Sequence, residues 1–198
     1  MQEIIQLNVS LLQSKPLIWR RILVHRDTTF FELHHIVQIS MGWQNYHLFE
    51  FSLEGYRIGE IDEGEKGSGF GSDQLLDCRE IKLGDIVTGP NDVITYSYDF
   101  GDGWKHRIEV EAFLPIDKSL SYPVCTNGQM ACPPEDCGGI HAFYHSLDIL
   151  KDKAHPDFRE TTQWFPRNYK PERFDRVKVN RQLARLDQSI RKWLGGGE

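Results

Sequence analysis

The sequence predicts an α+β fold in which a mixed sheet of about five strands carries helices packed on one side. Apolar and polar residues alternate in several runs between residues 4 and 114, as they do in strands with one buried face. Beyond residue 140 the apolar residues recur with helical spacing instead. Strands that precede helices, with one early helix between them, are typical of α+β proteins.

A hairpin opens the chain. Residues 5–11 place apolar side chains at every second position, which indicates a strand with one buried face. The turn-forming residues 14–16 follow, and residues 18–24 return as a second strand.

The third expected element is a helix. Thr29 and Glu32 have the spacing of a capping box, in which each side chain binds the backbone N–H of the other residue. Apolar residues with helical spacing continue from there, and Gly42 is expected to end the helix. Residues 49–53 alternate again and form the third predicted strand.

A mobile loop is expected next. Residues 59–77 are acidic and rich in glycine, and they have little periodicity. Such composition is typical of a loop between regular elements.

A second hairpin, over residues 93–114, is predicted to be the centre of the fold. A three-residue loop of Gly101, Asp102 and Gly103, with Gly103 in the left-handed region, separates the flanking side chains into an apolar and a polar face. The apolar face then pairs Phe100 with Trp104, Tyr98 with His106, Tyr96 with Ile108 and Ile94 with Val110. The polar face pairs Asp99 with Lys105, Ser97 with Arg107 and Thr95 with Glu109. This register points His106 toward an aromatic cluster and Asp99 toward solvent.

Helices are expected to complete the chain. Apolar spacing predicts one helix over residues 140–150 and another over residues 179–193, and Pro156 is a suitable start for a helix between them. We predict a single domain, 1–198, with a sheet-forming part in residues 1–115 and a cysteine loop and helical part in residues 116–194.

Charge is unevenly distributed along the chain, whose formal net charge is -6. Residues 61–150 contain 6 Lys or Arg against 16 Asp or Glu, whereas residues 151–198 contain 12 against 7. Such a division more often reflects packing of the basic segment on the acidic one than binding of an outside partner.

The N-terminus has no basic region followed by an apolar run, so no secretion signal is expected. No apolar run approaches the roughly 20 residues that a membrane span needs. We therefore expect a cytoplasmic protein without membrane contact. In that compartment the four cysteines stay reduced, namely Cys78, Cys125, Cys132 and Cys137.

Several motifs together resemble one protein family. They are YDFGDGW-x-H at residues 98–106, YP-x-C at 122–125, ACPPEDCGG at 131–139, P-x-IWRR at 16–21, MGW at 41–43, HP at 155–156 and NR-x-L at 180–183. The chain resembles the plasmid pRiA4b ORF-3-like family over residues 4 to 190, and it departs mainly in the glycine-rich segment before Cys78.

The resemblance implies an α/β-roll-like fold, an unknown role and occurrence on plasmids and mobile elements. Some members of the family carry the label of a TnpR-like transposon resolvase. The sequence does not support that activity, because Ser10 lies on the polar side of a predicted strand without the clustered arginines that activate a recombinase serine. Nor does it contain an Arg/His/Arg/Tyr set in a helical domain.

A zinc site is one candidate for chemistry. His106, Cys125, Cys132 and Cys137 are the ligand types of a closed tetrahedral zinc centre. Their spacing differs from the Cys-x2-Cys pairs of most structural zinc sites. The alternative is that the cysteines are small buried packing residues and that His106 is a core histidine.

Carboxylates and imidazoles form a second candidate set. Its members are Asp99, Asp102, Glu135 and Asp136, together with His106 and His47. Convergence of such groups in a cleft would suit a metal-dependent hydrolase. Each acid also has a structural explanation, in a turn, on a solvent face or before a helix.

Three candidate binding sites are also predicted. Tyr98, Trp104, His106 and Trp43 are expected to form an aromatic binding pocket. Gly138 and Gly139 could present free N–H groups to an anion. Arg176, Arg181 and Arg185 on the last helices are candidates for nucleic-acid contact, although no helix-turn-helix is present.

The sequence thus favours a non-catalytic binding or interaction module, with a protein partner preferred over nucleic acid. The alternatives are a zinc-binding protein or metal-dependent hydrolase that uses His106 and the loop of residues 132–137, and a nucleic-acid-associated protein.

Overall fold

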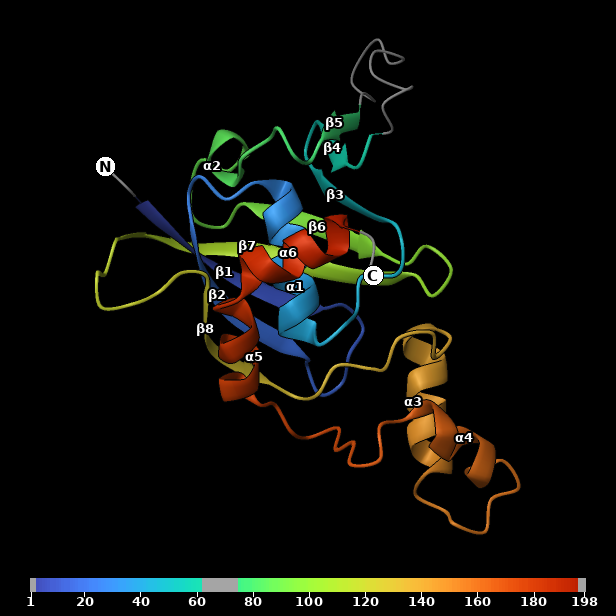
Figure 1. Cartoon of the computed structure of the whole chain (residues 1–198). Helices are drawn as coiled ribbons and strands as arrows, with labels where there is room; N and C mark the ends of the chain where they lie inside the picture. Colours follow the sequence, from blue (N-terminus) through green and yellow to red (C-terminus); the bar gives the residue numbers. More distant parts are fainter. Residues whose placement is uncertain (1–2, 62–74, 196–198) are drawn as a thin grey trace.

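The computed structural model describes residues 3–61 and 75–195, and there it shows one eight-stranded sheet with six helices (Figure 1). The strand order is β5-β4-β3-β6-β7-β1-β2-β8, with β4 and β5 parallel and the other pairs antiparallel. The α+β class with a mixed sheet is confirmed, and the expectation of about five strands is wrong. Most of the predicted mobile loop, residues 62–74, lies outside the described residues.

The sequence predicts five of the eight strands. These are β1 (Glu3–Leu11), β2 (Trp19–His25), β3 (Phe49–Leu53), β6 (Val93–Tyr98) and β7 (Trp104–Pro115). The additional strands are β4 (Tyr56–Gly59), β5 (Leu75–Asp77) and β8 (Val124–Gln129). Alternation does not reveal β4 and β5 because they have four and three residues, and β8 contains Asn127 and Gly128, which are poor strand formers.

The first helix, α1 (Phe30–Met41), has the predicted capping box. The Glu32 N–H donates to Thr29 Oγ1 at 3.1 Å, and the Thr29 N–H donates to Glu32 Oε2 at 2.8 Å. Gly42 ends the helix with a φ of 90°, a conformation that glycine adopts without strain.

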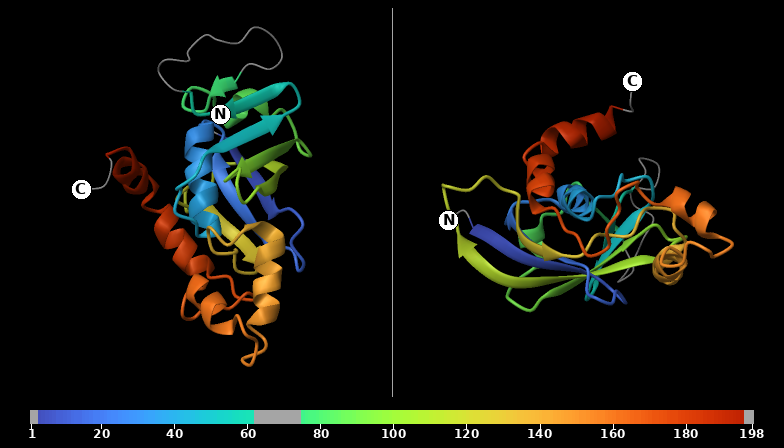
Figure 2. Two further views of the ribbon diagram at one scale, coloured as in Figure 1. Left: turned by 90° about the vertical axis from the view of Figure 1, so that its right-hand side faces the viewer. Right: turned by 90° about the horizontal axis from the view of Figure 1, so that it is seen from below.

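Helices form a second and a third layer over one face of the sheet. Figure 2 shows α1 against the sheet, with α5 (Arg176–Leu183) and α6 (Leu186–Leu194) stacked on its other side. Both sides of α1 are therefore covered, and its two histidines, His34 and His35, are buried. No described helix is long and apolar enough to cross a membrane.

The remaining helices lie nearer the edges of the sheet. α2 (Leu83–Ile86) is a single short turn between β5 and β6. α3 (Gly139–Ile149) and α4 (Phe158–Trp164) pair with each other beside the tip of the β6–β7 hairpin (Figure 1).

The β6–β7 hairpin has the predicted faces but a register that differs by two residues. Tyr98 lies opposite Trp104 and Tyr96 opposite His106, so the loop contains residues 99–103. A shift of two residues keeps every side chain on its face, which is why the predicted apolar residues of the strands are still buried. The exceptions are in the loop, where Phe100 is 60% exposed and Asp99 is only 7% exposed.

Candidate functional site

The hairpin loop is organised by Asp99, which the sequence wrongly places on the solvent face. The Asp99 N–H donates to the Leu48 carbonyl at 3.0 Å, and this bond ties the loop to the segment before β3. Asp99 Oδ1 accepts the N–H groups of Gly101 at 3.0 Å and Asp102 at 3.2 Å. The Gly103 N–H donates to the Asp99 carbonyl at 2.6 Å, and Gly103 has the predicted left-handed φ, 67°. These bonds fix the Asp99 carboxylate and leave its Oδ2 directed toward His47.

Trp43 connects this hairpin to the loop of residues 132–137. Its indole stacks on the Tyr98 ring with centroids 5.2 Å apart. The indole Nε1 donates to the Pro133 carbonyl at 2.9 Å. Trp43 therefore holds the proline pair of the loop against the aromatic residues of β6 and β7.

The acids of that loop bind groups on both neighbouring segments. Glu135 accepts the Gln44 N–H at 2.7 Å and the Tyr98 hydroxyl at 2.5 Å. The Gly138 N–H donates to Asp102 Oδ2 at 3.1 Å. Glu135 and Asp102, two carboxylates of the candidate set, thus lie at one end of the sheet, and each has defined hydrogen-bond partners.

Three side chains at this end have ligand atoms that converge. His47 Nε2 lies 2.9 Å from Asp136 Oδ1 and 3.6 Å from Asp99 Oδ2. All three ligand atoms lie within 4.8 Å of one another, and no other group of three or more His, Cys, Asp or Glu residues converges in this way among the residues that the structure describes. The Asp99 side chain is 10% exposed, whereas those of His47 and Asp136 are 31% and 56% exposed. Asp99 thus attaches the cluster to the protein interior, whereas His47 and Asp136 are accessible to solvent.

The candidate zinc ligands are arranged differently. His106 is fully buried between Trp43 and Tyr96, and neither ring nitrogen has a hydrogen-bond partner of good geometry among the described residues. Burial raises the pKa of Cys132 and of Cys137 to about 12, so these thiols stay protonated at neutral pH. No three of the ligand atoms of His106, Cys125, Cys132 and Cys137 come together.

The four predicted pocket residues are packed against one another in the core. Trp104, Tyr98 and His106 are at most 1% exposed and Trp43 is 7% exposed. Of the four rings, that of Tyr98 contacts the cluster, through an edge contact with the His47 ring at a centroid distance of 5.8 Å.

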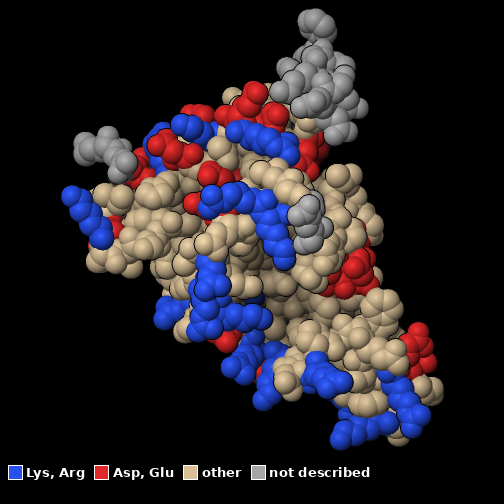
Figure 3. All heavy atoms as spheres, in the orientation of Figure 1, with Lys and Arg blue, Asp and Glu red and all other residues tan. Residues whose placement is uncertain are grey.

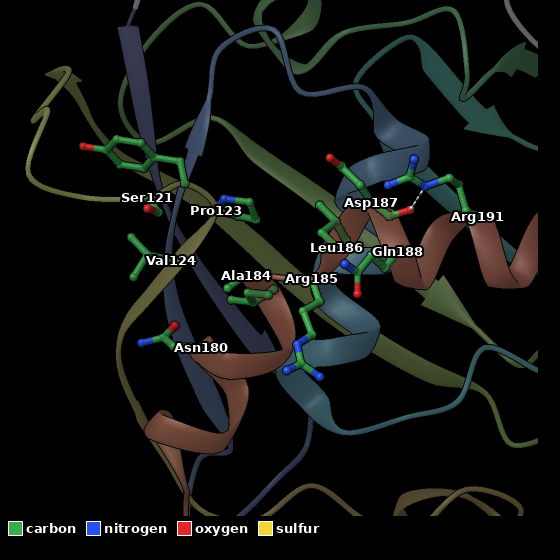
Figure 4. A pocket seen from close by; sticks show the side chains of 12 residues that line it. Ser121, Pro123, Val124, Asn180, Ala184, Arg185, Leu186, Asp187, Gln188 and Arg191 are labelled. Carbon is green, nitrogen blue, oxygen red and sulfur yellow. Dashed lines mark hydrogen bonds between the residues drawn. The ribbon is translucent and has the colours of Figure 1, made fainter.

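The arginines of the last helices lie on the surface. Arg176 donates to the Thr126 carbonyl of β8, whereas the side chains of Arg181 and Arg185 have no described partner. Lys and Arg gather over α5 and the segment that leads to it (Figure 3). A crevice of about 480 Å³ lies between the start of β8 and the helices α5 and α6. Ser121 and Pro123 line its β8 side, and the Arg185 side chain on the helix side extends away from them (Figure 4). Nucleic-acid contact by Arg176, Arg181 and Arg185 stays a prediction.

A close backbone contact at Gly139 yields a testable prediction. Gly139 has a φ of 80°, and a Cβ added there would lie 2.5 Å from the Asp102 carbonyl oxygen. We expect Gly139→Ala to lower the free energy of unfolding by about 2 kcal/mol or more in urea denaturation, because both backbone strain and the clash contribute. Gly55→Ala is the matched control, since Gly55 has a φ of 82° but no atom within 4 Å of the added Cβ. Equal losses for the two variants would contradict a role for the contact between Gly139 and the hairpin loop.

The sequence identifies all three residues of the cluster as candidates but gives the central role to a different imidazole. It includes Asp99, Asp136 and His47 in one set, yet it assigns the central role to His106. The contact between His47 and Asp136 joins segments 89 residues apart, and no local pattern encodes it. The sequence feature that could have indicated the site is the occurrence of three motifs, at residues 41–43, 98–106 and 131–139. The structure brings these motifs together.

Comparisons with known proteins extend this description. The family model for plasmid pRiA4b ORF-3-like protein matches residues 3–178. The uncharacterized protein y4hQ of Sinorhizobium fredii (strain NBRC 101917 / NGR234) is 35% identical over 163 residues, which are 81% of this chain and 80% of that protein. The crystal structure of MM3350, a protein of unknown function from Methanosarcina mazei Go1, has a TM-score of 0.80 and 32% identity, covering 90% of this chain and 98% of that one.

Proposed function

The chain belongs to the plasmid pRiA4b ORF-3-like family, and we propose that it binds a divalent metal ion through His47, Asp99 and Asp136. The observation that carries the proposal is the convergence of one imidazole nitrogen and two carboxylate oxygens within 4.8 Å. Adjacent ligand atoms around a tetrahedral zinc ion lie about 3.4 Å apart, given metal–ligand distances near 2.1 Å. Two of the three separations are 2.9 and 3.6 Å and the third, between the two carboxylate oxygens, is within 4.8 Å, so rotation of the exposed Asp136 side chain would bring all three atoms toward this spacing.

The ligand types indicate which metals the site would accept. Imidazole suits zinc, iron and copper, whereas carboxylates also bind manganese and magnesium. No thiolate takes part, so the site does not require a soft metal. We expect zinc to bind more tightly than manganese, in agreement with the general order of divalent affinities, and magnesium to bind weakly.

Neighbouring residues support the proposal by fixing two of the ligands. Asp99 Oδ1 accepts two loop N–H groups, so the carboxylate has one defined orientation with Oδ2 toward His47. Glu135, the residue directly before Asp136, is held by hydrogen bonds from the Gln44 N–H and the Tyr98 hydroxyl. Second-sphere contacts of this kind reduce the conformational entropy that metal binding would otherwise cost.

Three protein ligands would leave coordination positions open. Sites of this type hold a water molecule or part of a ligand at the metal, and the metal acts there as a Lewis acid. A cavity of about 460 Å³ between α3 and α4 begins at Asp136 and is also lined by His145, Glu160 and Trp164. The proposed function is therefore metal-dependent ligand binding at an exposed site, and hydrolysis by a metal-bound water is its catalytic alternative.

The same contacts support the proposal that residues 1–198 act as one domain. The sheet-forming part supplies Tyr98 and Asp102, and the helical part supplies the Glu135 carboxylate and the Gly138 N–H that bind them. The metal site lies at this junction, so neither part would hold the metal alone.

Calorimetric titration of zinc into metal-free protein tests the proposal. We expect about one site per chain, and we expect Asp99→Asn and Asp136→Asn each to weaken binding by at least about 100-fold, because removal of a direct ligand costs more than the 10- to 100-fold typical of second-sphere changes. Asp102→Asn is the matched control, since Asp102 lies in the same loop but outside the cluster.

A second pair of variants separates this site from the predicted cysteine site. Cys132→Ser and His106→Phe should retain zinc binding if His47, Asp99 and Asp136 hold the metal. Loss of binding in these two variants, with normal binding in Asp99→Asn, would contradict the proposal and favour the cysteine site.

A further inference from the structure

Arg20 in β2 is a buried cation without a counter-ion. The residue is 2% exposed, and no described carboxylate lies within ion-pair distance of its guanidinium. Nε donates to the Ser40 carbonyl at 2.8 Å, and Nη1 donates to the carbonyls of Trp19 at 2.7 Å and Gln129 at 2.8 Å. The third nitrogen, Nη2, has no hydrogen-bond partner among the described residues. Burial of a charge without a counter-ion is costly even when carbonyls accept its hydrogen bonds, so this arrangement calls for an explanation.

The surroundings of Arg20 offset only part of this cost. The ring of Phe174 lies 3.9 Å from the guanidinium carbon, in a cation–π contact. Ser40 belongs to the last turn of α1, whose carbonyls carry partial negative charge. Cys125 and Cys132 do not supply an anion, because burial raises the pKa of both thiols. Arg20 therefore has no described carboxylate within ion-pair distance, and Asp175, which lines the same cavity, lies 3.9 Å from Arg173 instead.

Arg20 also lines a cavity of about 230 Å³. The cavity lies between the end of α1, the loop of residues 131–134 and the segment that leads into α5. Its walls include the apolar side chains of Ile39, Met41, Phe174 and Val179. Its polar groups include Lys178, whose amine has no described partner, and Arg173, which lies 3.9 Å from Asp175. The cavity thus combines apolar walls with an excess of positive charge.

We propose that this cavity binds a small organic carboxylate, whose anionic group contacts Arg20 and whose hydrocarbon part lies between Met41, Phe174 and Val179. Carboxylates match the planar donor edge of arginine and form short, charge-assisted hydrogen bonds with it. The apolar walls favour a carboxylate with a hydrocarbon body over inorganic phosphate, which would leave those walls uncovered. This site is separate from the proposed metal site and shares no residue with its ligands.

Calorimetric titration with three probes tests the ligand class on the wild-type protein. We expect butyrate to bind with a dissociation constant near or below about 1 mM, and we expect butyramide, which has a similar size but no charge, to bind at least about tenfold more weakly. Equal binding of butyrate and butyramide would overturn the role of Arg20. Binding of inorganic phosphate without butyrate, or no binding of butyrate at roughly 10 mM, would overturn the ligand class.

Variants test the position of the ligand. Arg20→Met should abolish butyrate binding, and Val179→Phe should weaken it by filling the cavity while leaving the charge in place. Lys153→Met removes an exposed lysine elsewhere on the surface and should change nothing. If Arg20→Met fails to fold, unchanged butyrate binding by folded Val179→Phe would still overturn the proposal. Asp99→Asn should bind butyrate normally, so failure of the metal proposal and failure of this one are distinguishable.

Discussion

Trp104→Ala is expected to lower the free energy of unfolding by about 3 to 5 kcal/mol, which is the usual cost of removing a buried aromatic side chain. Trp104 is 1% exposed, and its ring lies 5.6 Å from that of Trp43. Trp104 begins β7 opposite Tyr98, so a cavity there would loosen the hairpin and the packing of Tyr98, which contacts His47 of the candidate metal site. Urea denaturation of the variant and of the wild type measures the difference.

Two controls sharpen this test. Phe100→Ala removes another aromatic residue of the same hairpin, but Phe100 is 60% exposed, so we expect a loss within about 0.5 kcal/mol. Trp104→Phe should cost less than Trp104→Ala, because Trp104 Nε1 has no partner within the described residues and its loss breaks no described hydrogen bond. A similar loss for Phe100→Ala and Trp104→Ala would contradict the observed hairpin register.

Acidification from pH 7 to pH 5 is expected to destabilise the fold by about 4 kcal/mol through His35 and His106 alone. Burial lowers the pKa of His35 to about 4 and that of His106 to about 3, from an ordinary value of 6.5. The unfolded chain therefore takes up protons before the folded protein does. The stability provided by the neutral forms is fully present above about pH 6.5 and is lost as the pH falls toward 4 and 3. Burial lowers the pKa of His34 as well and adds a loss of the same sign.

Thermal or urea unfolding at several pH values measures this effect. His106→Phe removes one of the titrating groups and should reduce the loss between pH 7 and pH 5 by about 2 kcal/mol. His141→Phe is the control for the substitution itself, since His141 is exposed. A pH profile that His106→Phe does not alter would contradict the lowered pKa of His106 in the folded protein.

The sequence predicts which face of a strand each side chain occupies better than it predicts which residues pair across two strands. Alternation determines which side chains of β6 and β7 point inward, because neighbouring residues of a strand face opposite sides. It cannot distinguish registers that differ by two residues, which share the same faces. The choice depends on Asp99, whose carboxylate binds two loop N–H groups and whose φ of 51° lies in the left-handed region. Asp is among the few residues that adopt this conformation at low cost.

The candidate site was likewise only partly predictable from local sequence patterns. Its acids stand in motifs that can be read locally, and the sequence assigns Asp99 and Asp136 to one carboxylate set. The imidazole that joins them, His47, lies in an irregular segment after α1 with no periodicity. Its position depends on Trp43 and Gln44 binding the loop of residues 133–135, and such long-range contacts appear only in the folded chain.

Anomalous diffraction from crystals soaked in manganese chloride tests the central claim most directly. We expect one peak at the manganese edge between His47 Nε2, Asp99 Oδ2 and Asp136 Oδ1, and no such peak in crystals of Asp99→Asn grown and soaked in the same way. Absence of a peak at these three atoms in the wild type, or a peak beside Cys132 and Cys137 instead, would contradict the metal site.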